Sequence, residues 1–149
     1  MKLNFENIKF KHTTSVQIRF NDLDMMGHVN NAIQLNYCDI ARVNYFQDVF
    51  GETLDWTKDS LVIASISIDY LNPILLYDNI VVHTKIQLIG NKSVVMLQEI
   101  VDIKTKEAKS RNSTVMACYD HQKKTTFHIY DRWIKSIEKF EGKVEYKKS

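Results

Sequence analysis

The chain has 149 residues, a length that suits one domain with its own hydrophobic core. Hydrophobic residues make up 44% and charged residues 26% of it, as in ordinary soluble proteins, and a formal net charge of +2 is too small to indicate nucleic-acid binding by itself. The N-terminus has no continuous apolar run and no later stretch approaches a transmembrane length, so we expect a cytoplasmic protein without a signal peptide or membrane span.

A β-strand is predicted over residues 14–20, where apolar and polar side chains alternate. The loop that follows carries two carboxylates, a glycine, a histidine and two asparagines just before an expected helix N-terminus. These residues are Asp22, Asp24, Gly27, His28, Asn30 and Asn31. The first turn of a helix offers unpaired N–H groups and a partial positive charge, so this loop can bind and polarise an electronegative group such as a carbonyl oxygen.

A long helix is expected to begin near Asn31 and to stop at Gly51. Asn31 followed by Gln34 resembles a capping box, with asparagine as the cap residue. Apolar residues cover nearly the whole circumference between these two ends, which is typical of a helix wrapped by other structure. We therefore predict a central helix and not a surface helix.

The pattern changes to that of strands after a polar linker over residues 52–60. Turns are expected at Asn72-Pro73 and Gly90-Asn91, because these residue pairs favour chain reversal. Four strands are predicted around these turns: residues 61–70, 80–89, 93–103 and 111–119. Apolar residues at helical spacing then predict an amphipathic C-terminal helix over about residues 129–141.

This order of elements favours an α+β fold in which an antiparallel sheet wraps around the long central helix. We expect a single domain over residues 1–149, with a core of about residues 14–122 that the C-terminal helix completes. The two cysteines, Cys38 and Cys118, lie in apolar-patterned segments without metal-ligand spacing. We expect both to be buried free thiols, and we expect no metal site.

The polar loop also carries a family resemblance. Residues 19–31 read RFNDLDMMGHVNN, and this stretch resembles the D-x-D-x-x-G-H-V-N-N loop of the hotdog-fold acyl thioesterases, with the 4-hydroxybenzoyl-CoA thioesterase type as the closest group. The similarity extends over roughly residues 14–140 and includes Ala41-Arg42 in the helix and Ile68-Asp69-Tyr70 in the following strand. An acidic pair followed by HVNN and a long helix is a fairly specific combination.

The resemblance implies a hotdog fold and an enzyme that hydrolyses the thioester of acyl-CoA to a free acid and coenzyme A. Asp24 matches the second aspartate of D-x-D and would be the catalytic carboxylate, as a nucleophile or as a general base. Backbone N–H groups near Asn31 would hold the thioester carbonyl. The family also implies active sites built between subunits, hence a homodimer or homotetramer, and coenzyme A as part of the substrate with no other cofactor.

The remaining loop residues have a structural and a functional interpretation. Asp22 is expected to bond loop N–H groups, and it is the fallback carboxylate. Gly27 is expected to permit a special backbone angle and to leave room for the thioester. His28 either orders the loop or carries a proton, since its unperturbed pKa lies near neutrality. Asn30 and Asn31 are expected to be helix caps first, with Asn31 contributing its main-chain N–H.

Contacts to the substrate are assigned to four residues: Asn30, Gln34, Tyr37 and Arg111. Many relatives of the family carry tyrosine where this chain has Gln34, so the acyl pocket near the helix start is expected to be more polar. Tyr37 is a core residue that could line an acyl tunnel. Arg111 could meet the phosphates of coenzyme A, although basic residues near hairpin ends are usually solvated.

Three alternative functions remain open on the same sequence. The first is a thioesterase that acts on acyl-carrier protein. The second is a non-catalytic acyl-CoA-binding module with the same fold. The third is a nucleic-acid-binding domain, motivated only by the lysine-rich C-terminal third; it ranks last because no basic stripe interleaves with exposed aromatic residues.

Overall fold

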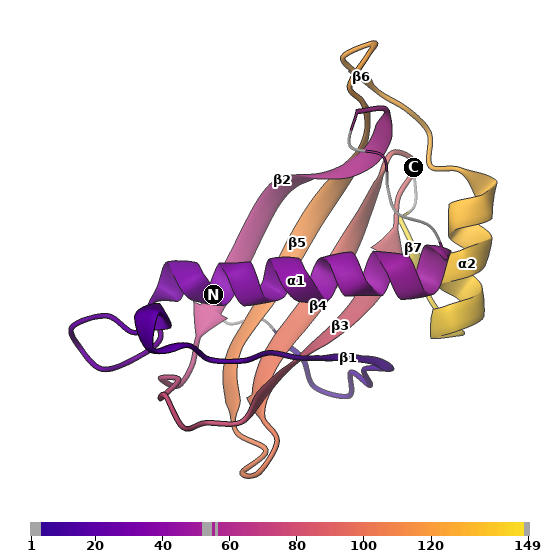
Figure 1. Cartoon of the computed structure of the whole chain (residues 1–149). Coiled ribbons are helices and arrows are strands. Elements are labelled where there is room, and N and C mark those ends of the chain that lie inside the picture. Colours follow the sequence, from indigo (N-terminus) through magenta and orange to yellow (C-terminus); the bar gives the residue numbers. More distant parts are fainter. Residues whose placement is uncertain (1–3, 52–54, 56, 148–149) are drawn as a thin grey trace.

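The computed structural model describes residues 4–51, 55 and 57–147. One sheet packs against a long helix, as Figure 1 shows, and its strands follow the order β1-β3-β4-β5-β2 with antiparallel pairing throughout. These strands are β1 (His12–Ser15), β2 (Asp59–Tyr70), β3 (Ile80–Ile89), β4 (Ser93–Asp102) and β5 (Ala108–Asp120). Two short strands extend the sheet: β6 (Thr125–Thr126) pairs with β5, and β7 (Glu145–Tyr146) pairs with β3. The expected α+β architecture is confirmed.

The helices are α1 (Asn31–Phe50) and α2 (Asp131–Glu141), with a short 3-10 turn, η1 (Phe20–Asp22), before α1. Helix α1 ends where the sequence predicts, because Gly51 adopts a left-handed conformation (φ 69°) and its N–H bonds to the Gln47 carbonyl. The predicted cap is wrong by one residue. Asn30 is the N-cap, and its side chain accepts a hydrogen bond from the Ala32 N–H at 2.8 Å.

The predicted strand over residues 14–20 is wrong in its extent. Only His12–Ser15 pairs with β3, and the chain then runs without a partner strand into η1. Val16 and Ile18 nevertheless pack against the apolar cluster beneath the first half of α1, so one face of this segment is partly buried. The alternation of apolar and polar residues therefore reflects burial of one face of this segment, although most of the segment does not pair with another strand.

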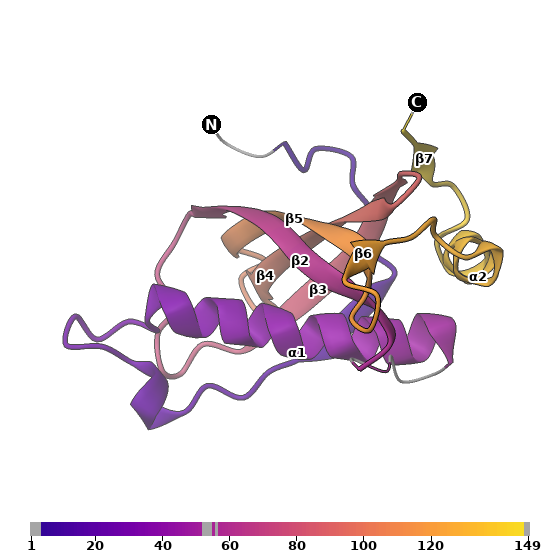
Figure 2. The same ribbon diagram turned by 90° about the horizontal axis from the view of Figure 1, so that it is seen from above.

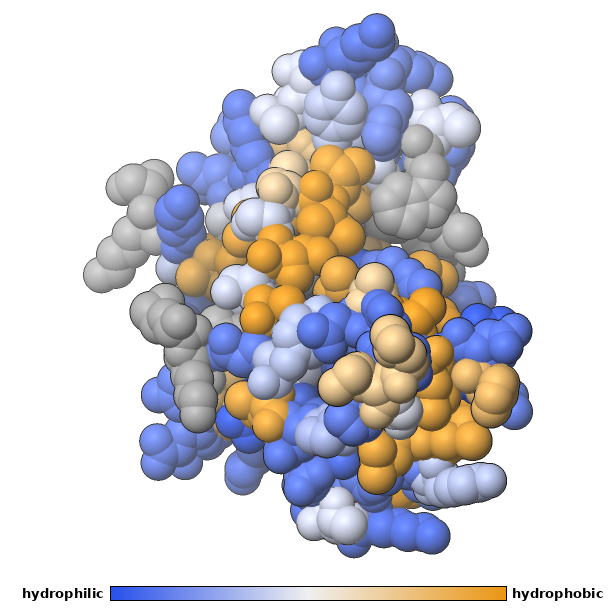
Figure 3. Space-filling view, turned by 90° about the vertical axis from the view of Figure 1, so that its left-hand side faces the viewer, coloured by the Kyte–Doolittle hydropathy of each residue, from blue (hydrophilic) through white to orange (hydrophobic). Residues whose placement is uncertain are grey.

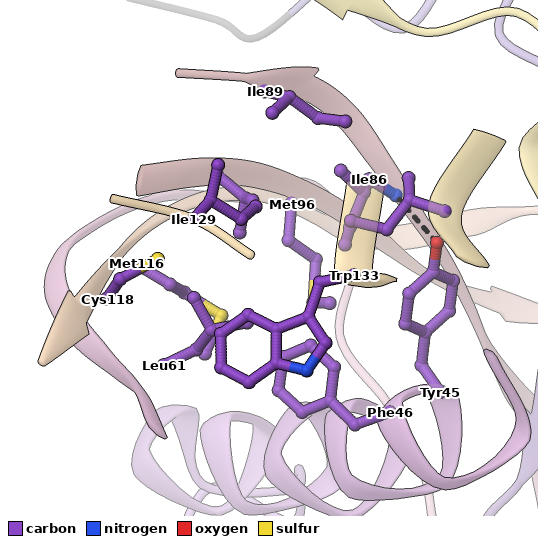
Figure 4. Close-up of a cluster of buried hydrophobic side chains, with 12 residues drawn as sticks. Tyr45, Phe46, Leu61, Ile86, Ile89, Met96, Met116, Cys118, Ile129 and Trp133 are labelled. Carbon is purple, nitrogen blue, oxygen red and sulfur yellow. Dashed lines mark hydrogen bonds between the residues drawn. The ribbon is translucent and has the colours of Figure 1, made fainter. Parts of the chain in front are cut away.

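Two apolar clusters hold the sheet to α1. Helix α2 closes the cluster at the C-terminal half of α1, where Trp133 (2% exposed) packs near Phe46, Leu61 and Met116, as Figure 4 shows. Burying side chains of this size stabilises the fold by about 1.5–3 kcal/mol each. The second cluster lies under the N-terminal half of α1 and includes Val29, Ala41, Ile74, Val82 and Ile100. It positions the start of α1 and the polar loop before it.

The described N-terminal residues lie on the other face of the sheet, away from α1, as Figure 2 shows. Phe10 stacks on His83 of β3 with ring centroids 5.6 Å apart, and the Arg111 guanidinium of β5 lies 5.5 Å from the centroid of the Phe5 ring. The N-terminal segment thus covers part of the outer face of the sheet over β3 and β5.

Helix α1 is not wrapped on all sides in the single chain, which corrects the expectation from its composition. Its apolar residues Ile40 and Val43 are about half exposed, at 50% and 52%. Apolar side chains also gather on the face of the molecule that Figure 3 shows, at the end where α1 begins. The exposed part of α1 is therefore partly apolar, and the expected wrapping on all sides does not occur within one chain.

Candidate functional site

Asp22 anchors the polar loop to the first turns of α1. Its carboxylate is 1% exposed and accepts hydrogen bonds from the Tyr37 hydroxyl at 2.5 Å and from the Arg19 N–H at 2.9 Å. Its carbonyl accepts from the Asn30 N–H at 2.9 Å. Burial alone would raise the pKa of the Asp22 carboxyl, but the hydrogen bonds from Tyr37 and Arg19 and the Arg19 charge outweigh it and lower that pKa.

Asp24 begins a tight turn at the exposed tip of the loop. Its Oδ1 accepts from the Met26 N–H at 2.9 Å, its carbonyl accepts from the Gly27 N–H at 3.0 Å, and its own N–H donates to the His28 carbonyl at 2.9 Å. Gly27 has φ 78°, and a Cβ atom there would meet nothing within 4 Å. Glycine is therefore required by the backbone angle, while the space beside it is open.

The start of α1 presents one free backbone donor. The Asn30 side chain accepts from the Ala32 N–H, and the Asn30 carbonyl accepts from the N–H groups of Ile33 (2.9 Å) and Gln34 (3.2 Å). The N–H of Asn31 has no hydrogen-bond partner among the described residues. This donor is available for an acceptor oxygen outside the chain, with the positive end of the α1 dipole behind it.

A cavity of about 240 Å³ opens at this end of α1. One wall comes from the loop and helix, and the other comes from the end of β2 and the segment after it. Its lining residues are His28, Val29, Asn31, Gln34, Tyr70, Leu71, Asn72 and Pro73. The Tyr70 hydroxyl donates to the Asn31 carbonyl at 3.1 Å, so strand β2 is fixed beside the free N–H. Three of the residues predicted for the site, His28, Asn31 and Gln34, therefore meet here.

Three of the four predicted substrate contacts do not line this cavity, and the side chain of one of them, Asn30, caps the Ala32 N–H. The Tyr37 hydroxyl is occupied by Asp22, and Tyr37 does not line the cavity. Arg111 lies on the sheet face opposite α1, because its neighbour Asn112 points toward α1 and adjacent strand residues point to opposite faces. There the Arg111 Nε donates to Glu99 at 2.6 Å. The sequence indicates that Arg111 is a residue type suited to phosphate binding, but it does not indicate which face of the sheet carries the side chain.

A buried polar stripe continues from the cavity along α1, formed by Gln34, Cys38 and Arg42 at every fourth position. The sheet meets it with polar groups: Asn112 Nδ2 donates to the Cys38 sulfur at 3.2 Å, and Gln98 Nε2 donates to the Cys38 carbonyl at 2.9 Å. Burial raises the pKa of the Cys38 thiol to about 11, so this buried thiol is protonated at neutral pH and is not a nucleophile.

The sequence interpretation missed Tyr70 and Asn72 as cavity residues. The signal was present, since Tyr70 ends a strand directly before Asn72-Pro73, and strand ends beside a turn often line sites. Over the described parts of the chain, no helix is long and apolar enough to span a membrane. The same residues contain no group of three or more histidine, cysteine, aspartate or glutamate side chains that could hold a metal ion.

Comparison with known proteins agrees with the fold. The sequence model of the thioesterase-like superfamily matches residues 18–139. The long-chain acyl-CoA thioesterase FadM of Escherichia coli (strain K12) is 28% identical over 90 residues, which cover 58% of this chain and 67% of FadM. The uncharacterized protein YsmA of Bacillus subtilis (strain 168) is 28% identical over 88 residues, and the match spans only 58% of this chain and 58% of YsmA.

A solved structure shares both sequence and shape with this chain over nearly its whole length. The thioesterase from Thermus thermophilus, determined in complex with coenzyme A and Zn, is 30% identical, with a TM-score of 0.79 over 90% of this chain and 96% of that one. The family match covers most of the chain, and the sheet wrapped on α1 is shared with this relative. The chain therefore belongs to the thioesterase-like superfamily and has the hotdog fold.

Proposed function

We propose that this protein is an acyl-CoA thioesterase that hydrolyses the thioester to a free acid and coenzyme A. The observation that carries the proposal is the free N–H of Asn31, which lies at the positive end of α1 and beside a cavity. A thioester oxygen bound there would receive a hydrogen bond that strengthens as negative charge develops on it in the transition state. Family membership and the likeness to FadM support the same reaction class.

Asp24 supplies the carboxylate in this proposal. It is exposed, and only its Oδ1 is engaged, by the Met26 N–H, so Oδ2 is available to attack the carbonyl carbon or to activate water. The tight turn at Gly27 holds Asp24 and His28 in one loop that leads directly into α1. His28 lines the cavity and is proposed to carry a proton to the leaving thiolate. The proposal includes no metal or redox cofactor.

A homodimer is part of the proposal. Strand β2 ends the sheet, and no described strand pairs with its outer edge, along which residues 63–67 are exposed. A long unpaired edge is a template for another strand, and a second copy of β2 related by a two-fold axis is the simplest partner. An apolar cavity of about 290 Å³ beside this edge, lined by Val43, Phe46 and Ile63 among others, supports burial of side chains from the second copy.

Two finer points belong to the same proposal. The group that carries the acyl chain is proposed to be coenzyme A, with acyl-carrier protein as the alternative. A tetramer made of two dimers is also compatible with an active site built between two subunits.

The two described cysteines, Cys38 and Cys118, are buried and free, which supports a reducing compartment such as the cytoplasm. The competing interpretation is an acyl-CoA-binding module without turnover, and it predicts that binding is indifferent to the Asp24 carboxylate.

The test is thiol release from a panel of acyl-CoA substrates by wild type, Asp24→Asn and Asp120→Asn. Asp120 is a matched control, because its Oδ1 also accepts a hydrogen bond from the N–H two residues later at 2.9 Å. The proposal expects kcat to fall about a hundredfold or more in Asp24→Asn, which loses its acid–base group, and to be unchanged in Asp120→Asn. Circular dichroism checks that all three are folded.

Other outcomes have distinct meanings. Unchanged turnover in Asp24→Asn would refute the role of Asp24 and direct the same test to Asp22. If wild type hydrolyses no acyl-CoA, acyl-carrier-protein thioesters are assayed next. Hydrolysis of those alone would support the carrier-protein alternative, whereas tight acyl-CoA binding without any turnover would support the binding module.

A further inference from the structure

Gln34 is a buried polar side chain without a partner. It lies one turn into α1, lines the cavity at the helix start and is only 2% exposed. Its Oε1 is buried without a hydrogen bond, and no hydrogen bond joins its side-chain amide to any described residue. A buried polar group without a partner is costly, and native proteins retain one mainly where a ligand or water satisfies it.

A second buried polar atom without a partner lies on the α1 face of the sheet, near the start of α1. Ser110 is fully buried, and its Oγ has no hydrogen-bond partner. Ser110 lies directly opposite Tyr70 in the β2–β5 register, so the two side chains are on the same face of the sheet. That is the α1 face, since the Tyr70 hydroxyl bonds to the Asn31 carbonyl. The neighbouring Asn112, by contrast, has a partner in Cys38.

We propose that the cavity recognises an acyl group that carries a hydroxyl close to the thioester, with the Gln34 amide as the recognition group. This inference rests on the proposed function, because it takes the Asn31 N–H as the position of the thioester oxygen. Gln34 follows Asn31 by three residues, a rise of about 4.5 Å along the helix axis, and helix side chains lean toward the N-terminus. The amide therefore serves a substituent on the first carbons beyond the carbonyl.

A hydroxyl suits this amide in either orientation. The O and N atoms of a glutamine side chain can exchange places by rotation, so the amide presents one acceptor and one donor group to the cavity. A hydroxyl donates to Oε1 and accepts from Nε2, whichever way the amide is turned. A plain alkyl chain satisfies neither atom and keeps the amide buried and unpaired. Sites built to bond a substrate hydroxyl discriminate against the analogue that lacks it for this reason.

The experiment compares a matched pair of substrates, 3-hydroxybutanoyl-CoA and butanoyl-CoA, by kcat/KM. It also compares the Kd values of the corresponding non-hydrolysable thioethers, S-(3-hydroxybutyl)-CoA and S-butyl-CoA. Two variants remove the amide while keeping similar bulk: Gln34→Leu and Gln34→Met. Gln47→Leu is the matched control, because Gln47 lies on the same helix but is exposed. Thermal unfolding checks each variant, and the Gln34 variants are expected to be no less stable, since they remove a buried unpaired group.

Wild type is expected to favour the hydroxylated member of each pair by about tenfold to a hundredfold, the range of one hydrogen bond whose loss leaves a buried group unpaired. Both Gln34 variants should lose this preference, and Gln47→Leu should keep it. Equal treatment of the two substrates by wild type, or a preference that survives in the Gln34 variants, would overturn the inference while leaving thioester hydrolysis intact. Absence of hydrolysis together with a Gln34-dependent preference for the hydroxylated thioether would refute the proposed reaction and uphold the recognition.

Discussion

Tyr37→Phe is expected to destabilise the protein through the loop that precedes α1. The substitution removes only the hydroxyl that donates to Asp22 at 2.5 Å, and both residues are buried, at 4% and 1% exposed. Asp22 would keep the Arg19 N–H at 2.9 Å, while the Arg19 guanidinium at 3.4 Å belongs to a solvent-exposed side chain and compensates little. A hydrogen bond to a charged group contributes about 1.5–3 kcal/mol, and each kcal/mol shifts Tm by about 2–4 °C at this chain length. We expect Tm to fall by about 3–12 °C.

The loss should depend on pH in a defined direction. The pKa of Asp22 is lowered in the folded protein because hydrogen bonds and the Arg19 charge outweigh burial, so the unfolded chain binds its proton more readily. The stability that Asp22 contributes is therefore fully present above its unfolded pKa of about 4 and is lost as the pH falls through the folded pKa. Removing the Tyr37 hydroxyl raises the folded pKa, so the difference between variant and wild type should be largest near neutrality and shrink in acid.

The assay is urea unfolding of wild type, Tyr37→Phe and Tyr77→Phe from about pH 3 to about pH 7, with the free energy of unfolding extrapolated to water. Tyr77 is 93% exposed and serves as the control for loss of a tyrosine hydroxyl. If Tyr37→Phe is as stable as wild type at neutral pH, the hydrogen bond to Asp22 contributes nothing. A deficit that stays constant down to the acid limit would refute the charge-assisted origin and leave packing as the cause.

Three further substitutions test the scaffold of the site. Ile66→Lys on the free edge of β2 should raise the Kd of the proposed dimer at least about tenfold in sedimentation, because burying an isoleucine contributes about 1.5–3 kcal/mol. Ile103→Lys is the control and should leave the Kd unchanged, since Ile103 is 41% exposed and Ile66 is 37% exposed. Asn30→Ala removes the cap of the Ala32 N–H and should lower the unfolding free energy by about 1 kcal/mol, and no change would show that water replaces the cap. Gly27→Ala should cost about 1–2 kcal/mol at φ 78°, and full stability would mean that the loop relaxes to another angle.

The local signals in the sequence were reliable where short-range chemistry determines structure. Helix α1 stops at Gly51 because a residue without Cβ takes the left-handed angle there. Strands β3 and β4 meet at the predicted turn, where the Gly90 N–H bonds to the Ser93 carbonyl at 2.7 Å. Residues 19–31 identified the loop, and the structure brings His28 and Asn31 to one cavity, although the catalytic assignments themselves stay predictions.

The features that the sequence did not predict depend on partners far along the chain. Whether Arg111 faces α1 or the opposite side is set by the register of β5, and a shift of one residue would reverse it. The unpaired state of Gln34 is equally invisible, because it depends on which groups from β2 and β5 approach the helix. Exposure of Ile40 likewise depends on where the sheet ends. Periodicity reports that a side chain is apolar or polar, but tertiary contacts decide what it meets.

The N-terminal segment limits which surfaces would be open to a second copy in the proposed dimer. Phe10 stacks on His83 of β3, and the Phe5 ring lies beside Arg111 of β5, so the segment covers part of the outer face of the sheet, where Val81 and Leu97 are 6% and 9% exposed. Shortening the chain to begin at His12 would remove the rings that lie over His83 and Arg111 and would leave this partly polar, partly apolar face open to a second sheet. In the proposed dimer the N-terminal segment occupies that place, so the free edge of β2 and the exposed side of α1 are the surfaces left for a second copy.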